Sequence, residues 1–476
     1  MPKRVSWWAV GLAACLGVLL LAISRPIAAG RPASAVPAPA RAGHSASVSA
    51  QAGYSASRRG SGRAACSARE PFAPPRVATL PTAGLLALDA RRGLAIVVSS
   101  MADARGTHVT VDEYDVKTGR AVRSGRIDAA PLVRTVGSRI LSDLASVAVD
   151  GTTGRIFLLH APYLSGLSPA GRVDVLDARA LTLLHTERVG GLAQPPLVDE
   201  TTGRVFIASQ AGGNISVLDA TTGRRVRTVA LSRVPLGPSA APILDERTGR
   251  VFFAEDTARG RVDALDARDG AIVRRIAVGP FPQTLAVDRA NGHVLVASGT
   301  GGGVDVLDAR DGTLLHAAPL PGPSSGLTVA ETTHRAFVSY ADRDTVSMLD
   351  TATGTLLRTV PVRRDYDLLR RRRHAREQAD GAAYPVVARV DETMRWVVVR
   401  APEISDDEGI EPGSAQLTVL DTRTATRVHT IITGDTWPEA AAIDTRRGRA
   451  FVAAAGGMAV YDVSCLTSYY VFGDLG

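Results

Sequence analysis

Lysine is almost absent from this chain of 476 residues: Lys3 and Lys117 are the only two among 55 basic residues, and arginine supplies the rest. Against 47 acidic residues this gives a net charge of +8, which by itself favours an anionic partner such as a nucleic acid. The excess lies in residues 1–76, where ten basic side chains stand beside one acidic one. Residues 77–476 hold 45 basic and 46 acidic side chains, so we expect no nucleic-acid partner.

Cysteine and the common motifs of catalysis are equally scarce. The chain has three cysteines, and neither a C-x-x-C-H haem site nor a G-x-S-x-G, Walker or H-E-x-x-H motif occurs in it. Its nine histidines are scattered. We therefore predict no catalytic, cofactor-binding or metal-binding residue and no cofactor.

Charge is missing from the run Val5–Ile23, which follows Lys3 and Arg4 and precedes the small residues Ala28 and Ala29. This pattern predicts that residues 1–30 are either a cleaved signal peptide or a retained signal anchor that forms an apolar helix. Residues 31–76, rich in Ala, Pro, Ser and Arg, predict a disordered linker. The chain is thus expected outside the cytoplasm, secreted or anchored to the membrane by its N-terminal segment.

One pattern recurs throughout residues 77–476. In residues 197–231, four short β-rich runs are separated by two D-x-x-x-G turns, Asp199–Gly203 and Asp219–Gly223. The aspartate accepts backbone N–H groups of its own turn, and the glycine takes the left-handed conformation that a tight hairpin needs. The first turn recurs from Asp89, Asp150, Asp245, Asp288 and Asp444, and the second from Asp115, Asp266, Asp308 and Asp350.

The period of these turns predicts the architecture. Successive second-turn aspartates lie 42 residues apart at 177–219, 266–308 and 308–350, and 47 apart at 219–266. Two further units have degenerate first turns that end at His334 and Arg395. We predict an all-β protein, a β-propeller of eight four-stranded blades with seven as the alternative. Runs such as Val205–Ala208, apolar on both faces, suit strands between neighbouring blades, and residues 76–80 are placed to complete the last blade.

These units resemble the YVTN-type β-propeller repeat family, whose consensus is close to residues 199–223. The resemblance covers nearly all of 77–476, although Phe206–Ser209 stands where the family has Tyr-Val-Thr-Asn. It implies a ring of seven or eight blades, usually outside the cytoplasm, and leaves the function open.

The long connections all fall at one end of the strands. In a meander the two D-x-x-x-G turns of each unit lie on one side, here named the turn face, which we expect to be uniform and inert. The opposite side, the insertion face, receives five longer connections and is the expected binding surface. These connections are Ser99–His108, Asp128–Ser146, His160–Gly171, Val362–Tyr384 and Ala401–Ala415.

Candidate binding residues on the insertion face are the arginines of one connection and three aromatic residues: Arg370, Arg371, Arg372, Arg373, Tyr163, Phe281 and Trp437. The arginines either bind an anionic group or are solvated, or are neutralised by the acidic segment 403–411. The function expected is that of a monomeric, non-enzymatic scaffold, tethered to the envelope, that binds a protein, peptide or glycan. A lactonase-like or oxidoreductase-like enzyme that uses the central funnel is the alternative.

Cys15 lies in the apolar run, which leaves Cys66 and Cys465 as the candidate disulfide. These two residues flank the ends of the predicted ring, which must meet. A bond between them would close a loop of 399 residues, and chain entropy predicts a stabilisation of roughly 5 kcal/mol.

Overall fold

The structure is a computed structural model, and all of its described residues belong to one compact unit, 66–369 with 383–476. It describes residues 76–80, 85–103, 106–127, 134–136, 139–141, 144–161, 171–231, 241–255, 257–300, 302–340, 342–362, 386–391, 395–401, 414–436, 440–444, 449–454 and 457–462. The apolar run, the linker, Cys66 and Cys465 lie outside these ranges. Within them, no helix is both long and apolar enough to cross a membrane.

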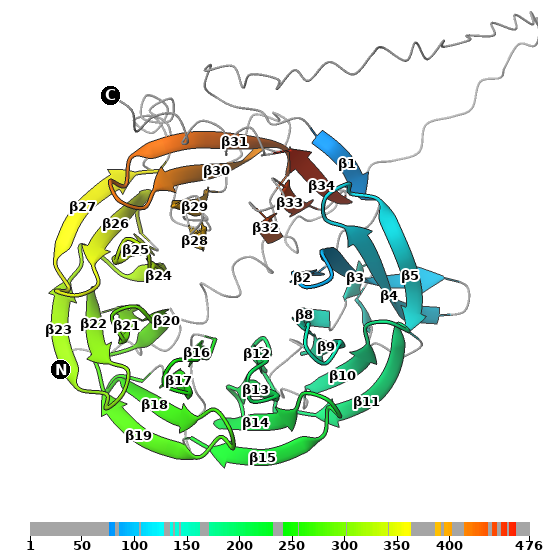
Figure 1. The fold of residues 1–476 in the computed structure, drawn as a ribbon, viewed down its shortest axis with the longest axis horizontal. Coiled ribbons are helices and arrows are strands. Elements are labelled where there is room, and N and C mark those ends of the chain that lie inside the picture. The colour runs from blue at the N-terminus through cyan, green and yellow to red at the C-terminus, as the bar shows by residue number, and fades with distance from the viewer. Residues whose placement is uncertain are drawn as a thin grey trace, which may run out of the picture. The chain divides into compact units, whose positions relative to one another are not determined.

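The described strands form eight four-stranded antiparallel sheets, arranged as blades around a centre (Figure 1). Blades 1 to 3 consist of β2 (Leu85–Asp89), β3 (Leu94–Asp103), β4 (Gly106–Asp115) and β5 (Ala121–Ile127); β8 (Leu144–Asp150), β9 (Arg155–His160), β10 (Arg172–Asp177) and β11 (Thr182–Arg188); and β12 (Leu197–Asp199), β13 (Arg204–Ser209), β14 (Asn214–Asp219) and β15 (Arg225–Ala230).

Blades 4 to 7 follow the same order, from the innermost to the outermost strand. They consist of β16 (Ile243–Asp245), β17 (Arg250–Glu255), β18 (Arg261–Asp266) and β19 (Ile272–Ala277); β20 (Pro282–Asp288), β21 (His293–Ser298), β22 (Gly303–Asp308) and β23 (Leu314–Pro319); β24 (Ser324–Ala330), β25 (Arg335–Tyr340), β26 (Thr345–Asp350) and β27 (Leu356–Pro361); and β28 (Val386–Asp391), β29 (Trp396–Ala401), β30 (Ser414–Asp421) and β31 (Arg427–Thr436).

Blade 8 closes the ring with strands from both ends of the chain. β32 (Ala440–Asp444), β33 (Arg449–Ala454) and β34 (Gly457–Asp462) supply its inner strands, and β1 (Arg76–Leu80) pairs antiparallel with β34, with Ala78 opposite Val460. Figure 1 shows β1 beside β34, and the innermost strands β2 and β32 also contact each other. The predicted role of residues 76–80 is confirmed, and the described strands make eight blades rather than seven.

The core lies between the blades, because their two middle strands are buried on both faces. In β13 Val205, Phe206, Ile207 and Ala208 are fully buried, as the sequence predicts. Phe206 and Ala208 pack with blade 4 residues, whereas Val205 and Ile207 pack with blade 2 residues. The outermost strands show the opposite pattern and are mostly exposed. Each blade therefore covers the apolar face of its neighbour.

The D-x-x-x-G turns form as predicted. Gly203 N donates to Asp199 O at 2.9 Å, and the Asp199 carboxylate accepts the N–H of Thr201 at the same distance. Gly203 has a φ of +65°, and the degenerate turns repeat this conformation without glycine, with φ of +53° at His334 and +56° at Arg395. The degenerate units therefore keep the backbone of the repeat and lose only its preferred residue.

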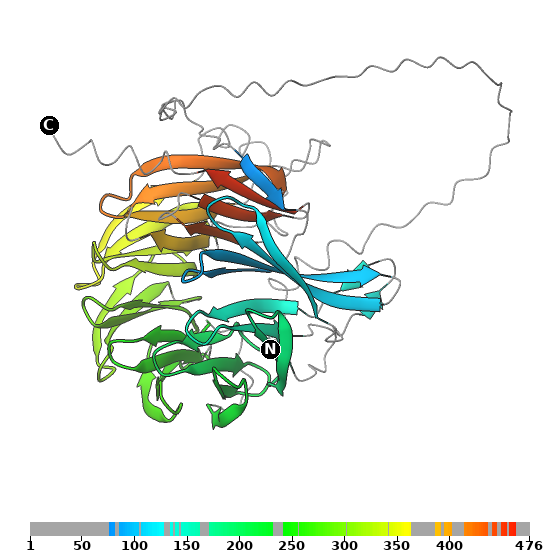
Figure 2. The ribbon, with the colours of Figure 1, turned by 45° about the vertical axis from the view of Figure 1, so that its right-hand side comes forward.

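The first of the predicted insertions is not a loop. Residues 99–108 continue β3 and β4 as a hairpin, in which Met101 pairs with His108 and Asp103 with Gly106. Figure 2 shows this pair projecting beyond the other blades. The expectation of a separate long connection is wrong here, since residues 99–103 pair with residues 106–110 and lengthen the ladder of β3 and β4. Within residues 128–146, β6 (Arg134–Val136) and β7 (Arg139–Leu141) form a further hairpin.

Candidate functional site

Glu200 connects three blades on the turn face. It accepts Arg91 Nη2 of blade 1 at 2.9 Å, and the Gly151 N–H and Thr152 Oγ1 of blade 2, each at 2.9 Å. Burial raises the pKa of Glu200, but the Thr152 and Gly151 hydrogen bonds and the Arg91 guanidinium outweigh it and hold the pKa below its ordinary value. Glu200 is thus an anionic tie between neighbouring first turns.

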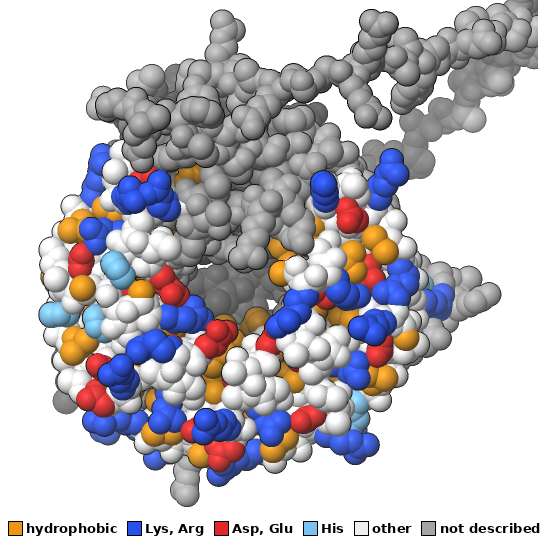
Figure 3. All heavy atoms as spheres, viewed as in Figure 1, with side chains coloured by type: hydrophobic (Ala, Val, Ile, Leu, Met, Phe, Trp, Pro, Cys, Tyr) orange, Lys and Arg blue, Asp and Glu red, His pale blue; other side chains and the backbone are white. Residues whose placement is uncertain are grey.

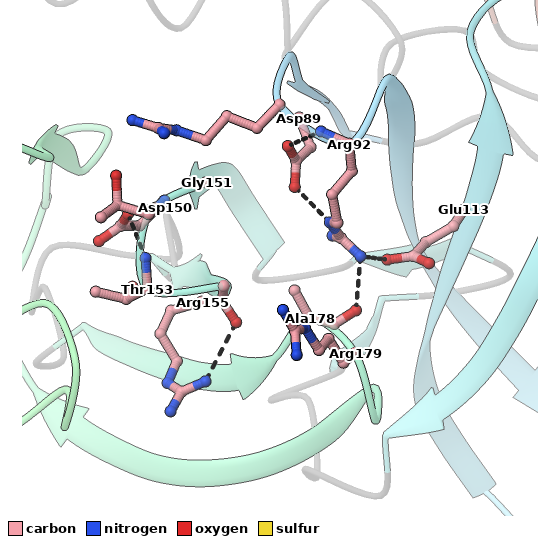
Figure 4. A network of polar contacts seen from close by, with 12 residues as sticks. Asp89, Arg92, Glu113, Asp150, Gly151, Thr153, Arg155, Ala178 and Arg179 are labelled. Carbon is pink, nitrogen blue, oxygen red and sulfur yellow. Dashed lines mark hydrogen bonds and ion pairs between the residues drawn. The ribbon is translucent and has the colours of Figure 1, made fainter.

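Arg92 makes a second tie between blades, shown in Figure 4. Its guanidinium contacts Asp89 at 2.6 Å and Glu113 at 3.0 Å within blade 1, and donates to the Ala178 carbonyl of blade 2 at 3.1 Å. Arg123 also donates to the buried Glu113 and to Ala178. Removing Arg92 would take from the buried Asp89 the guanidinium that contacts it, whereas Glu113 would keep Arg123.

Arg289 repeats this arrangement on the other side of the ring. It pairs with Glu331 of blade 6 at 2.7 Å and donates to the Leu244 carbonyl of blade 4 at 3.2 Å. Figure 3 shows basic and acidic side chains interspersed over the described part of one face. These ionisable groups of the turns neutralise one another, so their chemistry is that of structural ties between blades.

The opposite end of the blades carries a layer of buried polar side chains. In blades 2 to 6 its members are the last residue of the second strand and the third residue of the third strand, and in blade 1 they are Ser99 and Thr110, whose hydroxyl groups share a hydrogen bond of 2.7 Å. We name them the polar layer: Ser99, Thr110, His160, Asp174, Ser209, Ser216, Glu255, Asp263, Ser298, Asp305, Tyr340 and Ser347. Second strands end where the connections of the insertion face begin, so the polar layer lies at that end.

Blade 2 places a histidine–aspartate pair in the polar layer. His160 Nε2 lies 3.1 Å from Asp174 Oδ2, Thr186 Oγ1 donates to Asp174 Oδ1 at 2.7 Å, and Arg172 Nε lies 3.5 Å from Oδ2. Burial raises the pKa of Asp174, yet the His160 and Thr186 hydrogen bonds and the Arg172 charge lower it further, and the net shift is downward. Asp174 is therefore held as a carboxylate.

Blade 4 places two carboxylates, Glu255 and Asp263, at the corresponding positions. Here the net shift of the aspartate pKa is upward instead of downward. Burial raises the pKa of Asp263 to about 6 although Arg261, whose Nε lies 3.0 Å from Oδ1, lowers it; the Glu255 carboxylate raises it further. Arg261 also contacts Glu255 and donates to the Leu231 carbonyl of blade 3 at 2.9 Å. One guanidinium thus serves two buried acids.

Blade 5 has a pocket instead of a buried ion pair. The pocket measures about 140 Å³ and is lined by Gly279, Pro280, Pro282, Val296, Ser298, Gly303 and Asp305. The Gly279 N–H donates to Asp305 Oδ2 at 2.6 Å, and Ser298 Oγ donates to the Pro280 carbonyl at 2.7 Å. Of the described features, this one combines a cavity with a half-buried carboxylate, and it is the candidate binding site.

A model of the family described as outer membrane protein assembly factor BamB matches residues 27–276 and 258–461. The chain belongs to this family. The propeller-repeat class predicted from the sequence is thereby confirmed, whereas the narrower YVTN type stays a prediction. None of the curated proteins compared matches the chain.

Two solved structures support the BamB-type fold. The crystal structure of BamB from Moraxella catarrhalis has a TM-score of 0.53 at 17% identity, covering 81% of this chain and 98% of that one. A crystal structure of the computationally designed Ika8 protein has a TM-score of 0.54 at 16% identity, covering 82% and 98%. At these identities the likeness concerns the fold alone.

In this BamB-family chain, most of the predicted binding residues fall outside the described ranges: Tyr163, Arg370, Arg371, Arg372, Arg373 and Trp437. Phe281 is described and half-buried, with a φ of +52°. Its N–H donates to the Thr257 carbonyl and its carbonyl accepts the Gly299 N–H, each at 2.9 Å. It stands between the pocket residues Pro280 and Pro282, and its role in binding stays a prediction.

The pocket residues themselves were missed. Motif searches look for several chemical groups close together in sequence, whereas Asp305 is a single carboxylate in an apolar strand. The signal available was positional: the third strands read Arg-Val-Asp in blades 2 and 4 and Gly-Val-Asp in blade 5. Within the described ranges, no group of three or more His, Cys, Asp or Glu is arranged to hold a metal ion.

Proposed function

We propose that this protein is an exported, non-enzymatic scaffold of the cell envelope that binds a polypeptide partner through the insertion face. The observation that carries the proposal is the difference between the two ends of the blades. On the turn face, charged side chains such as Arg91 and Glu200 pair with each other across blades. At the other end stand the extended β3–β4 hairpin and the pocket of blade 5. Longer connections and a cavity favour binding at that end.

The family supplies the class of partner. The matching model is described as an outer membrane protein assembly factor, and a factor of that description acts on other proteins. We therefore favour a protein or peptide partner over a glycan. Export and tethering through residues 1–30, and a monomeric state, are parts of the same proposal that rest on the sequence pattern.

The segment Asp365–Asp380, which the sequence predicts on the insertion face, is the part to test first, because its arginines suit an acidic partner surface. Deleting it should abolish capture of envelope proteins by the immobilised protein, with the melting temperature nearly unchanged. A variant with Arg370–Arg373 changed to glutamine separates charge from length. If both variants capture the same proteins as the unaltered chain, the segment has no part in binding.

The enzyme hypothesis stays a prediction without a favouring observation. The described ionisable groups of the first turns are paired, Arg91 with Glu200 and Arg289 with Glu331. A general acid or base needs to face a substrate, and these groups face one another. The scaffold function is therefore the one that the geometry supports best.

A further inference from the structure

In blades 2 and 4 the third strand pairs its first residue with its third. The third residue is aspartate, Asp174 or Asp263, and the first is arginine, whereas in blade 1 the equivalent aspartate, Asp112, has Thr110 two residues before it. Both arginines point along the strand to the carboxylate, with Arg172 Nε 3.5 Å and Arg261 Nε 3.0 Å from it. Where the third residue is serine, as in blades 3 and 6, the first is Asn214 or Thr345. The buried carboxylates of blades 2 and 4 are thus each matched by a guanidinium from their own strand.

Blade 5 differs from blades 2 and 4, because it has a cavity beside the carboxylate and no arginine in its third strand. Its third strand keeps the carboxylate, Asp305, but begins with Gly303, and both residues line the pocket of about 140 Å³. Among the described residues no cation forms an ion pair with Asp305; its Oδ2 accepts only the Gly279 N–H. Because Asp305 is half-buried rather than enclosed, a group from outside can reach it.

A backbone carbonyl stands at the equivalent sequence position beside the pocket. In blade 4, Arg261 donates to the carbonyl of Leu231, the residue that follows the last strand of blade 3. The residue that follows the last strand of blade 4 is Val278, directly before the pocket residue Gly279. A planar guanidinium can donate to a carboxylate and a carbonyl at once, as Arg261 does, whereas an ammonium is a compact point charge.

We propose that the blade 5 pocket binds a guanidinium group supplied from outside the chain, namely an arginine side chain of the partner polypeptide. The pocket corresponds to the space that the side chains of Arg172 and Arg261 occupy in blades 2 and 4. In blade 5 the equivalent residue is Gly303, which has no side chain to fill it. The inference rests on the proposed function for the source of the guanidinium, since a free guanidinium compound has the same chemistry. It adds to that function a defined site and the kind of side chain recognised.

Calorimetric titration of the full chain tests the proposal with three probes: acetyl-Gly-Arg-Gly-amide, the same peptide with citrulline in place of arginine, and arginine amide. Citrulline keeps the shape and removes the charge, so its peptide should bind at least about tenfold more weakly, the ratio expected for losing a charged hydrogen bond. Equal binding of the peptide and arginine amide assigns the site to free guanidinium compounds, and tighter binding of the peptide assigns it to polypeptides. Equal affinity for the arginine and citrulline peptides, or no binding of either, overturns the proposal.

Three substitutions locate the effect. Gly303→Arg supplies the missing side chain and should abolish peptide binding while the melting temperature holds or rises. Asp305→Ser introduces the residue that blades 3 and 6 carry and should weaken binding about tenfold or more. Leu314→Arg is the control, because it adds the same charge at an exposed position of the outermost strand of blade 5 that does not line the pocket, and binding should stay within about twofold. Unchanged binding in a folded Asp305→Ser variant would exclude this pocket.

The same variants separate this inference from the proposed function. If Gly303→Arg loses the arginine peptide yet still captures envelope proteins, the pocket binds guanidinium but does not hold the partner, and the partner arginine is refuted. If the unaltered chain captures no envelope protein while the peptide binds, the scaffold function fails and the pocket remains. Loss of both activities in Gly303→Arg, with the fold intact, is the result that we expect.

Discussion

His334 and Arg395 occupy positions at which most blades have glycine. Their φ values of +53° and +56° lie in the left-handed region that side chains with a Cβ avoid. The surrounding sheet imposes this conformation, since the Asp288–Gly292 and Asp245–Gly249 turns have the same shape with glycine. Strain of this kind is a property of single residues, and at His334 its removal also removes a contact of 3.7 Å between Nδ1 and the buried Asp288 carboxylate.

We predict that His334→Gly raises the free energy of unfolding by about 1 kcal/mol, because the left-handed strain disappears. The matched control is Gly203→Ala in the equivalent turn of blade 3. A Cβ at Gly203 meets nothing within 4 Å, so the φ of +65° alone should cost about 1 kcal/mol. Urea denaturation measures both, and shifts of the same sign would refute the account of these turns.

A second prediction about a single residue concerns Asp263 and the pH dependence of the free energy of unfolding. Burial raises its pKa from 3.8 to about 6, so the folded state binds this proton more tightly than the unfolded chain does. Its contribution to stability is full below pH 4 and is lost as the pH rises from about 4 to about 6. Asp263→Asn should therefore flatten the pH profile in this window and be more stable than the unaltered protein at pH 7.

The turn aspartate Asp219 acts in the opposite direction and provides the control. Burial raises the pKa of Asp219, but hydrogen bonds from Thr222 and the Arg204 charge outweigh it, and the pKa is lowered. Its contribution is present above pH 4 and is lost on acidification. Asp219→Asn should therefore reduce stability at pH 7, where Asp263→Asn increases it. Unfolding curves of both variants at pH 4, 5, 6 and 7 test this, and a change of the same sign in both at pH 7 would contradict the prediction.

At the scale of strands and blades, the sequence predicts what is local. Each D-x-x-x-G turn contains the groups that stabilise it, so the strands on either side of Asp199–Gly203 or Asp219–Gly223 could be placed without the structure. The length of β3 and β4 could not, because residues 99–108 look like a loop until their cross-strand pairs form. The pocket of blade 5 also escaped, since Gly279 and Asp305 meet only through the fold.

The pairing of β1 with β34 predicts where the ring is vulnerable. β1 is the outermost strand of blade 8, so alternate N–H groups point to β34 and to solvent. Of the two substitutions Ala78→Pro and Thr79→Pro, one should remove a ladder hydrogen bond and cost about 3 kcal/mol or more, and the other should cost much less. Equal effects of both on the melting temperature would mean that β1 does not close the ring.

At the scale of the whole molecule, the net charge and the propeller lie in different parts of the chain. The net charge of +8 comes from residues 1–76, and the propeller of this BamB-family chain is nearly neutral. Arginines such as Arg92 and Arg289 are used between blades, which explains their abundance without an anionic ligand. The two ends of the blades thus divide the work: one end holds the ring together, and the other is proposed to bind.

The most direct test of this division is site-specific photo-crosslinking in an envelope preparation from two matched alanines. Ala258 is exposed in the connection between β17 and β18 on the insertion face, and Ala352 is exposed in the turn after β26 on the turn face. A photoreactive residue at Ala258 should yield discrete crosslinked polypeptides, and one at Ala352 should yield none. Crosslinks from Ala352 alone, or the same products from both positions, would contradict binding through the insertion face.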